Sequence, residues 1–230
     1  MTDTTLYDGR VTLRFSEKAH RYSVSVDGGK FKWCPGVTTI LGVIDKPALV
    51  GWRTKVITKA FKEHLGMVLT EDMVKECLAA PKTDMKAAGK IGTEVHNALE
   101  AAAQGEKPRF TSSVALRAYE NALKWFRQND VKPLHIERKL YSIKYNYAGT
   151  VDLIAEVNGQ LAIIDYKTGK GIYSDQMLQL AAYSGAFQEE FGFGPVRRMI
   201  LRASKEENQE PGFEVGDATD FADDDDTFLA

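Results

Sequence analysis

The stretch Gly149-Thr-Val-Asp-Leu-Ile-Ala-Glu-Val157, followed by Asn158-Gly159 and by Gln160-Leu-Ala-Ile-Ile-Asp-Tyr-Lys167, decides the fold of this chain. Two runs rich in Val, Ile and Leu flank the Asn-Gly pair. Asn-Gly is the strongest short signal for a β-hairpin, because a two-residue type I′ turn needs positive φ at both positions. Such a turn fixes the register, so that Val157 faces Gln160 and Asp152 lies opposite Asp165.

Two aspartates at opposed positions of a buried hairpin need a positive partner. Opposed Cβ atoms are roughly 4.5–5.5 Å apart, and like charges there destabilise a sheet. Lys167 lies two residues beyond Asp165 and so shares its face. A divalent cation is a second source of positive charge, since Mg²⁺ is usually held by one or two carboxylates. A buried Asp–Lys pair with a spare aspartate is the simpler alternative, but three ionisable groups exceed what a pair needs.

Length and composition are those of an ordinary soluble globular protein, with 230 residues for one medium domain and its additions. No apolar run is long enough to span a membrane, and the polar N-terminus lacks a secretory pattern. Cys34 and Cys77 lie far apart without CxxC spacing, so they cannot build an iron–sulfur or zinc site alone. We expect a cytoplasmic protein.

The net charge of −2 hides an asymmetry along the chain. Residues 206–230 hold ten acidic side chains and no Lys or Arg, which leaves residues 1–205 with 30 basic and 22 acidic side chains and a net charge of +8. A basic body with an acidic tail is typical of proteins that meet nucleic acid. A solubilising tail on an unrelated domain would look the same.

Hydrophobic periodicity predicts an α/β fold with a central mixed β-sheet flanked by helices, an N-terminal β-meander and a helical insert. We expect the meander within residues 1–45, the core within 46–205, and an acidic, mostly disordered tail over 206–230, with a possible short strand at Glu214. The pattern predicts helices over 47–64, 70–79, 85–104, 112–129 and 174–191, and core strands over 135–143, 148–157, 160–168 and 196–203.

Four motifs occur in a set order along the chain: Gly92-Thr-Glu-Val-His96 on a helix, Gly149-Thr-Val-Asp152, Asp165-Tyr-Lys167, and Gln179-Leu-Ala-Ala-Tyr183. Together they resemble the RecB-like branch of the PD-(D/E)XK nuclease superfamily, over roughly Val37 to Ala203. The segment around Val37–Leu41 and Lys46-Pro47 looks like phage-encoded members. The resemblance implies a restriction-endonuclease-like core.

The resemblance also implies roles for individual residues. Asp152 and Asp165 match the metal ligands, with the backbone carbonyl of Tyr166 as a third, and Lys167 matches the catalytic lysine. His96 matches the histidine that adds a metal ligand in this branch, and such a ligand makes a site friendlier to Mn²⁺. The implied cofactor is therefore Mg²⁺ or Mn²⁺. Without the other motifs, His96 would read as a surface or core histidine.

Further residues are candidates for DNA binding or for support of the site. Gln179 and Tyr183 stand one helical turn apart, on a face that borders the site in the family, although packing by the ring alone is the alternative. Glu100 shares the face of His96 and either holds the imidazole or is surface charge. For Glu137 a metal-site and a structural role are comparable, and Lys170 either approaches a phosphate or belongs to a simple turn.

The motifs and the charge asymmetry predict a metal-dependent deoxyribonuclease, and the resemblance to the RecB-like branch implies an exonuclease that acts on DNA ends in phage recombination, replication or genome processing. A DNA-binding recombination accessory protein without turnover and a structure-specific endonuclease are the alternatives. The acidic tail ends in apolar residues and loosely resembles the tips with which single-strand-binding proteins recruit partners. It would dock on such a protein or a replication protein, fold back on the basic groove, or act only as a solubilising tail.

Overall fold

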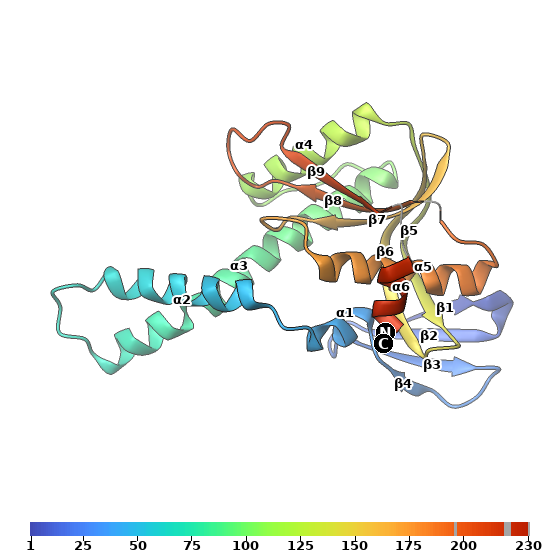
Figure 1. Ribbon diagram of the computed structural model, residues 1–230, viewed down its shortest axis with the longest axis horizontal. Coiled ribbons are helices and arrows are strands. Elements are labelled where there is room, and N and C mark those ends of the chain that lie inside the picture. Colours follow the sequence, from blue (N-terminus) through green and yellow to red (C-terminus); the bar gives the residue numbers. More distant parts are fainter. Residues whose placement is uncertain (196, 219–221, 230) are drawn as a thin grey trace.

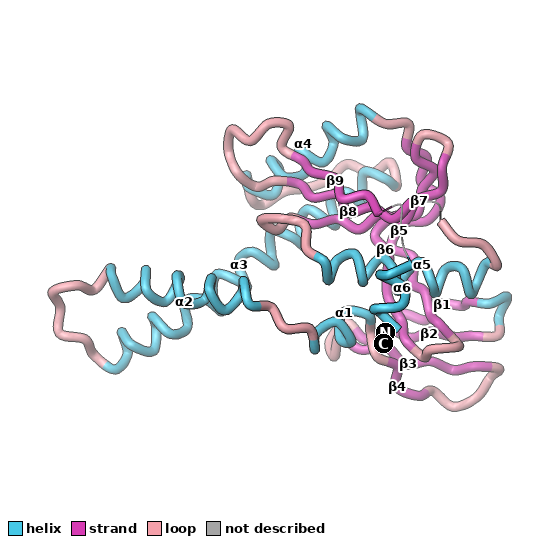
Figure 2. The backbone as a smooth tube through the Cα atoms, in the orientation of Figure 1, coloured by secondary structure: helices cyan, strands magenta, loops and turns pink. Residues whose placement is uncertain are grey.

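The computed structural model describes residues 1–195, 197–218 and 222–229 of the chain. Its strands form two sheets (Figures 1 and 2). The N-terminal sheet is antiparallel in the order β1-β2-β3-β4, with a 3-10 turn η1 (Tyr7–Gly9) after its first strand. Its strands are β1 (Thr2–Leu6), β2 (Val11–Ser16), β3 (Arg21–Val26) and β4 (Lys32–Cys34). The expected meander is therefore present, and β1 extends it because Leu6 is buried although the rest of that strand is polar.

The second sheet has the order β5-β6-β7-β8-β9 and is mixed. Only the β7–β8 pair is parallel among the described strands. A parallel pair needs a crossover, which helix α5 (Ser174–Phe191) supplies. The strands are β5 (Val131–Ser142), β6 (Tyr147–Val157), β7 (Gln160–Lys167), β8 (Arg197–Ala203) and β9 (Phe213–Ala218). This confirms the expected α/β class with a mixed sheet between helices.

Helices cover both faces of the mixed sheet (Figure 1). On one face, α5 packs through Leu180 and Phe187 together with α1 (Val37–Ile40) and the 3-10 turn η2 (Leu41–Val43). On the other face lie α4 (Ser113–Gln128) and the C-terminal part of α3 (Glu71–Ala103). A smaller cluster that includes Leu13 and Tyr141 joins the N-terminal sheet to the body.

Helix α2 (Pro47–Lys62) and the N-terminal part of α3 project from the body as a helical arm, on the left of Figure 1. The expectation of two helices, 70–79 and 85–104, is wrong, because α3 continues through Pro81. A helical proline lacks one backbone hydrogen bond and crowds the carbonyl four residues earlier. Within the continuous helix, the hydroxyl of Thr83 donates back to the carbonyl of Ala79 at 3.4 Å. The described helices are all too short or too polar to cross a membrane.

The expectation of a mostly disordered tail is also wrong for the described residues. Strand β9 completes the mixed sheet, and α6 (Ala222–Leu229) packs on α5. Phe213 and Val215 join the core, and Phe228 lies edge-on to Tyr147 at 5.1 Å between ring centroids. Five acidic residues of the tail pair with cations of α4 and β8: Arg117–Glu207, Lys124–Glu210, Arg202–Glu214, Arg197–Asp217 and Arg198–Asp225.

Candidate active site

The β6–β7 hairpin has the register that its turn predicts. Asn158 and Gly159 both have positive φ, 51° and 80°, as a type I′ turn requires. Pairing runs from the turn to Leu153, which faces Ile164, and Asp152 is the next residue beyond that last pair. The two strands therefore separate where the two aspartates lie, which leaves their carboxylates available to other groups.

The opposite edge of β6 is interrupted at the same residue. In the β5–β6 pairing, Leu153 faces Ile136 and Val151 faces Arg138, while Asp152 and Glu137 between them are not paired. Glu137 has φ of 49°, in the left-handed region that few non-glycine residues adopt. Backbone strain of this kind concentrates at functional sites.

Asp165 and Lys167 form a nearly closed polar network with α5. The Lys167 ammonium is paired with the Asp165 carboxylate and donates a hydrogen bond to Gln179 Oε1 at 3.2 Å. Gln179 Nε2 donates to Asp165 Oδ1 at 3.1 Å and to the Tyr183 hydroxyl at 2.7 Å. Gln179 therefore holds both charged side chains at once, because it accepts from the lysine and donates to the aspartate. The expected shared face of Asp165 and Lys167 is confirmed by these contacts.

Asp152 is held from two other directions. Its Oδ2 accepts the backbone N–H of Tyr166 at 2.6 Å, and its Oδ1 lies 3.4 Å from His96 Nδ1. His96 comes from α3, and its ring packs edge-on to the ring of Tyr166. The structure thus brings His96, Asp152, Asp165 and Lys167 together from one helix and two strands.

Charge and burial shift the pKa values of these groups. Burial raises the pKa of Asp165; Lys167 opposes this rise, and the charge of Asp152 adds to it. Burial lowers the pKa of His96, but the carboxylates of Asp152 and Asp165 outweigh it, so the net pKa is raised. Burial likewise opposes the charge of Lys167, and Asp165 outweighs it, so that the lysine pKa is raised and its ammonium form is favoured.

Glu137 faces the same centre. Burial, followed by the charges of Asp152 and Glu100, raises its pKa to about 7. Glu100 accepts a hydrogen bond from Gln104 Nε2 at 3.1 Å, whereas the imidazole of His96 lies against Asp152. The geometry therefore connects Glu100 to the site through its charge.

Lys170 is exposed in the loop after β7. Burial lowers the pKa of Lys205; the charge of Glu206 opposes this effect, and the charge of Lys170 adds to it. Arg202 lies beside Lys167 in the parallel pairing and donates to the carbonyl of Gly169 at 3.3 Å and to Glu214 at 2.8 Å. It anchors the start of the Lys170 loop. Arg202 is a residue near the site that none of the four motifs includes, and its signal in the sequence is an arginine within an apolar strand.

Close packing against Tyr183 explains why residue 149 is a glycine. A Cβ built on Gly149 would lie 3.0 Å from Tyr183 Cδ1, still closer to Cε1, and 3.3 Å from Val37 Cγ2. Only glycine lets the buried ring of Tyr183 approach the strand this closely, and that ring places the hydroxyl bonded to Gln179. Two residues that the motifs did not single out tie the N-terminal sheet to this strand, since the hydroxyls of Tyr22 and Thr150 are 2.9 Å apart.

The donor set fits a hard divalent cation by its chemistry. Within residues 1–195, 197–218 and 222–229, no three His, Cys, Asp or Glu side chains already form a metal cluster. Asp165 nevertheless has a raised pKa although Lys167 is paired with it. Burial is the main cause of this rise, and the charge of Asp152 adds to it. Carboxylate oxygens with one imidazole are donors that Mg²⁺ and Mn²⁺ accept.

Comparison with known proteins agrees with this geometry. A family model described as PD-(D/E)XK nuclease superfamily matches residues 111–229, which include Asp152, Asp165 and Lys167. The chain belongs to the PD-(D/E)XK nuclease superfamily. His96 lies before the matched range, so its place in the site rests on its contact with Asp152.

A solved structure titled "Crystal structure of SSO0001" is similar to the chain, with 16% sequence identity and a TM-score of 0.37. The match covers 76% of this chain and 81% of that one. No curated protein matches the chain.

Proposed function

We propose that this protein is a metal-dependent deoxyribonuclease that hydrolyses phosphodiester bonds at DNA ends. The observation that carries the proposal is that the His96–Asp152 pair and the Lys167–Asp165 pair lie close enough for their charges to act on one another. The motif order resembles the RecB-like branch, and this resemblance favours an exonuclease that works in phage recombination, replication or genome processing, in the cytoplasm of the host.

In this proposal, Asp152, Asp165, His96 and the carbonyl of Tyr166 would hold Mg²⁺ or Mn²⁺. The bound cation would act as a Lewis acid and lower the pKa of a water molecule. Lys167 keeps its proton because Asp165 raises its pKa, so it offers a positive charge to the scissile phosphate. When DNA draws the ammonium away, the carboxylate of Asp165 is freed, while Gln179 continues to hold its other oxygen.

The remaining candidates would position these groups. Gln179 and Tyr183 would fix Asp165 and Lys167 from α5, and Glu137 and Glu100 would set the negative charge around the centre. Lys170 would lie within the reach of substrate at the end of β7.

The test is cleavage of end-labelled linear DNA and covalently closed circular DNA with Mg²⁺, with Mn²⁺ and with EDTA. We expect loss of the linear substrate alone, abolished by Lys167→Ala and unaffected by Lys144→Ala, a matched change on an exposed turn. Cleavage of the circle would identify an endonuclease instead. Binding of DNA without metal-dependent cleavage would contradict the enzyme and favour an accessory protein.

We also propose that the acidic tail contacts a single-strand-binding or replication protein. Asp226 and Leu229 are exposed on α6, whereas Asp225 and Phe228 are engaged within the chain. An Asp226→Lys variant should weaken such a complex in isothermal titration with a single-strand-binding protein. Equal binding by the variant and the wild type would argue against this partner.

A further inference from the structure

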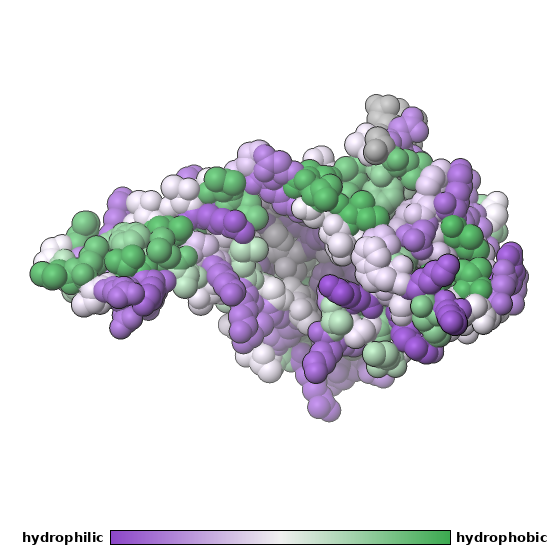
Figure 3. Space-filling view, turned by 90° about the horizontal axis from the view of Figure 1, so that it is seen from below, coloured by the Kyte–Doolittle hydropathy of each residue, from purple (hydrophilic) through white to green (hydrophobic). Residues whose placement is uncertain are grey.

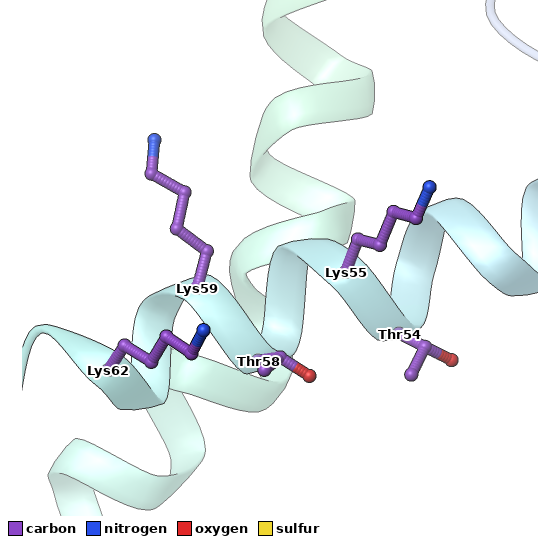
Figure 4. Close-up of a pocket in the computed structure, with 5 residues that line it drawn as sticks. All are labelled: Thr54, Lys55, Thr58, Lys59 and Lys62. Carbon is purple, nitrogen blue, oxygen red and sulfur yellow. The ribbon is translucent and has the colours of Figure 1, made fainter.

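Helix α2 carries a row of exposed lysines along the helical arm. Its sixteen residues include Arg53, Lys55, Lys59 and Lys62 and no acidic residue. The half-buried stripe of Trp52, Val56 and Ala60 packs toward α3. The three lysines follow each other at spacings of four and three residues, so they share a different side of the helix, which is exposed (Figure 4).

The side chains on this side of α2 border an open surface hollow of about 310 Å³. Lys55, Lys59 and Lys62 line it mainly with the aliphatic parts of their side chains, and Thr54 and Thr58 add hydroxyls, with no carboxylate in the lining (Figure 4). The row spans seven residues, or about 10 Å of helix axis. Duplex DNA carries roughly six negative charges over that length.

The charge of this row is not neutralised within the described part of the chain. Lys55, Lys59 and Lys62 have no carboxylate within ion-pair distance among residues 1–195, 197–218 and 222–229. The tail acids pair instead with cations of α4 and β8, on the body. The structure therefore leaves a net positive surface on the arm, away from the acidic tail.

Both helices of the arm lead from this surface to the candidate active site. At the root of α2, Lys46 is paired with Asp175 at 2.6 Å, in the first turn of the helix that supplies Gln179. On α3, Lys82, Lys86 and Lys90 are exposed and four residues apart, which places them on one stripe. Lys90 precedes His96 by six residues, or about 9 Å along the axis.

The tip of the arm is apolar. Leu65, Met67 and Val68, between α2 and α3, are 61–92% exposed, and Figure 3 shows apolar residues gathered at this far end. A lipid surface would use such a tip, whereas a nucleic-acid backbone would use the lysine rows behind it. The rows lead to a nuclease site, and this favours nucleic acid.

We propose that the lysine rows of the arm, Lys55-Lys59-Lys62 and Lys82-Lys86-Lys90, bind the phosphate backbone of DNA independently of sequence and guide it to the Asp152–Lys167 centre. This inference rests on the proposed function, because it assigns the substrate-binding surface of the same site. Contacts of ammonium groups with phosphates position a strand without reading bases.

The experiment measures binding of fluorescently labelled duplex and single-stranded DNA by anisotropy in EDTA, over a series of salt concentrations. It compares the wild type with Lys55→Gln/Lys59→Gln/Lys62→Gln. We expect the variant to bind about 10- to 500-fold more weakly near 0.1 M salt, with a log–log salt slope smaller by about 2–3 for duplex DNA. Gln has a helix propensity close to that of Lys, so circular dichroism should show unchanged folding.

The matched control removes the same three charges elsewhere. Lys18→Gln/Lys30→Gln/Lys32→Gln changes exposed residues of the N-terminal sheet and should bind DNA like the wild type. An unchanged salt slope in the α2 variant, or an equal loss in the control, would overturn the proposal. So would binding of the wild type to phosphatidylglycerol vesicles but not to DNA.

Binding in EDTA separates this inference from the proposed function. If the α2 variant lost DNA binding and the wild type did not cleave DNA in Mg²⁺ or Mn²⁺, the DNA-binding role of the lysine rows would be supported and the proposed nuclease activity would be refuted. If the wild type cleaved DNA with metal and the α2 variant still bound DNA fully, the DNA-binding role of the lysine rows would be refuted and the proposed nuclease activity would be supported.

Discussion

Replacing Gly149 by alanine tests whether the contact between β6 and Tyr183 organises the site. The new methyl group would lie 3.0 Å from Tyr183 Cδ1 and still closer to Cε1, and the ring is 4% exposed. The ring cannot swing into solvent, so α5 or β6 must shift. Because the Tyr183 hydroxyl accepts from Gln179, the shift reaches the groups that hold Asp165 and Lys167.

Overpacking of a buried site typically costs about 1–3 kcal/mol, and a rigid ring places this case at about 2–3 kcal/mol. For a chain of this size, each kcal/mol lowers the melting temperature by about 2–4 °C, so we expect a fall of roughly 4–12 °C. Calorimetry and urea unfolding of Gly149→Ala measure it. DNA cleavage by the folded variant should fall as well.

Gly51→Ala is the matched control, because a Cβ at that helical position meets nothing within 4 Å. It should raise the free energy of unfolding by about 0.5–1 kcal/mol. The double variant Gly149→Ala/Tyr183→Leu should lose less unfolding free energy than the two single variants lose together, by at least about 1 kcal/mol. A Gly149→Ala protein as stable as the wild type, or strictly additive costs, would refute the packing argument.

Three other measurements test separate parts of the structure. Glu137 has a pKa of about 7 in the folded protein, above its ordinary value of 4.5, so its ionisation destabilises the fold as pH rises between those values. In metal-free urea titrations, Glu137→Gln should therefore raise the free energy of unfolding by about 1–2 kcal/mol at pH 8, after allowance for solvent screening. At pH 4.5 it should change this free energy very little. Burial raises the pKa of Cys34 to about 12, and Cys34 and Cys77 are both nearly inaccessible, so a thiol reagent at pH 8 should label neither until the chain unfolds; rapid labelling of folded protein would contradict this. Phe228→Ala removes the ring that contacts Tyr147 and should lower the free energy of unfolding by about 1–2 kcal/mol, as measured by thermal unfolding. An unchanged free energy of unfolding would mean that α6 does not pack on the body.

The hairpin and the helices with strong periodicity could be predicted because their signals are local. Asn158-Gly159 fixed a register that the pairing of Leu153 with Ile164 confirms. The reach of His96 to Asp152 depends instead on how α3 packs on the sheet, so only resemblance pointed to it.

The tail and the long helix could not be read from local signals. The possible strand at Glu214 lies within β9, but the acidic composition of residues 206–230 does not predict that Asp217 and Glu214 pair with Arg197 and Arg202 of the adjacent strand. Pro81 suggested a break, but one lost hydrogen bond is a small part of a helix of 33 residues. Both outcomes depend on contacts between segments distant in sequence.

Helix α3 extends from the arm into the candidate active site as one continuous helix. Thirty-three helical residues span about 50 Å, and the segment after Pro81 carries both the second lysine row and His96. The helix continues from Lys82 to Ala103 without interruption, so Lys82, Lys86, Lys90 and His96 belong to one helical segment. In the proposed function, a phosphate bound by these lysines and a cation bound by His96 would contact the same helical segment, and by thermodynamic reciprocity the binding of either would change the affinity for the other.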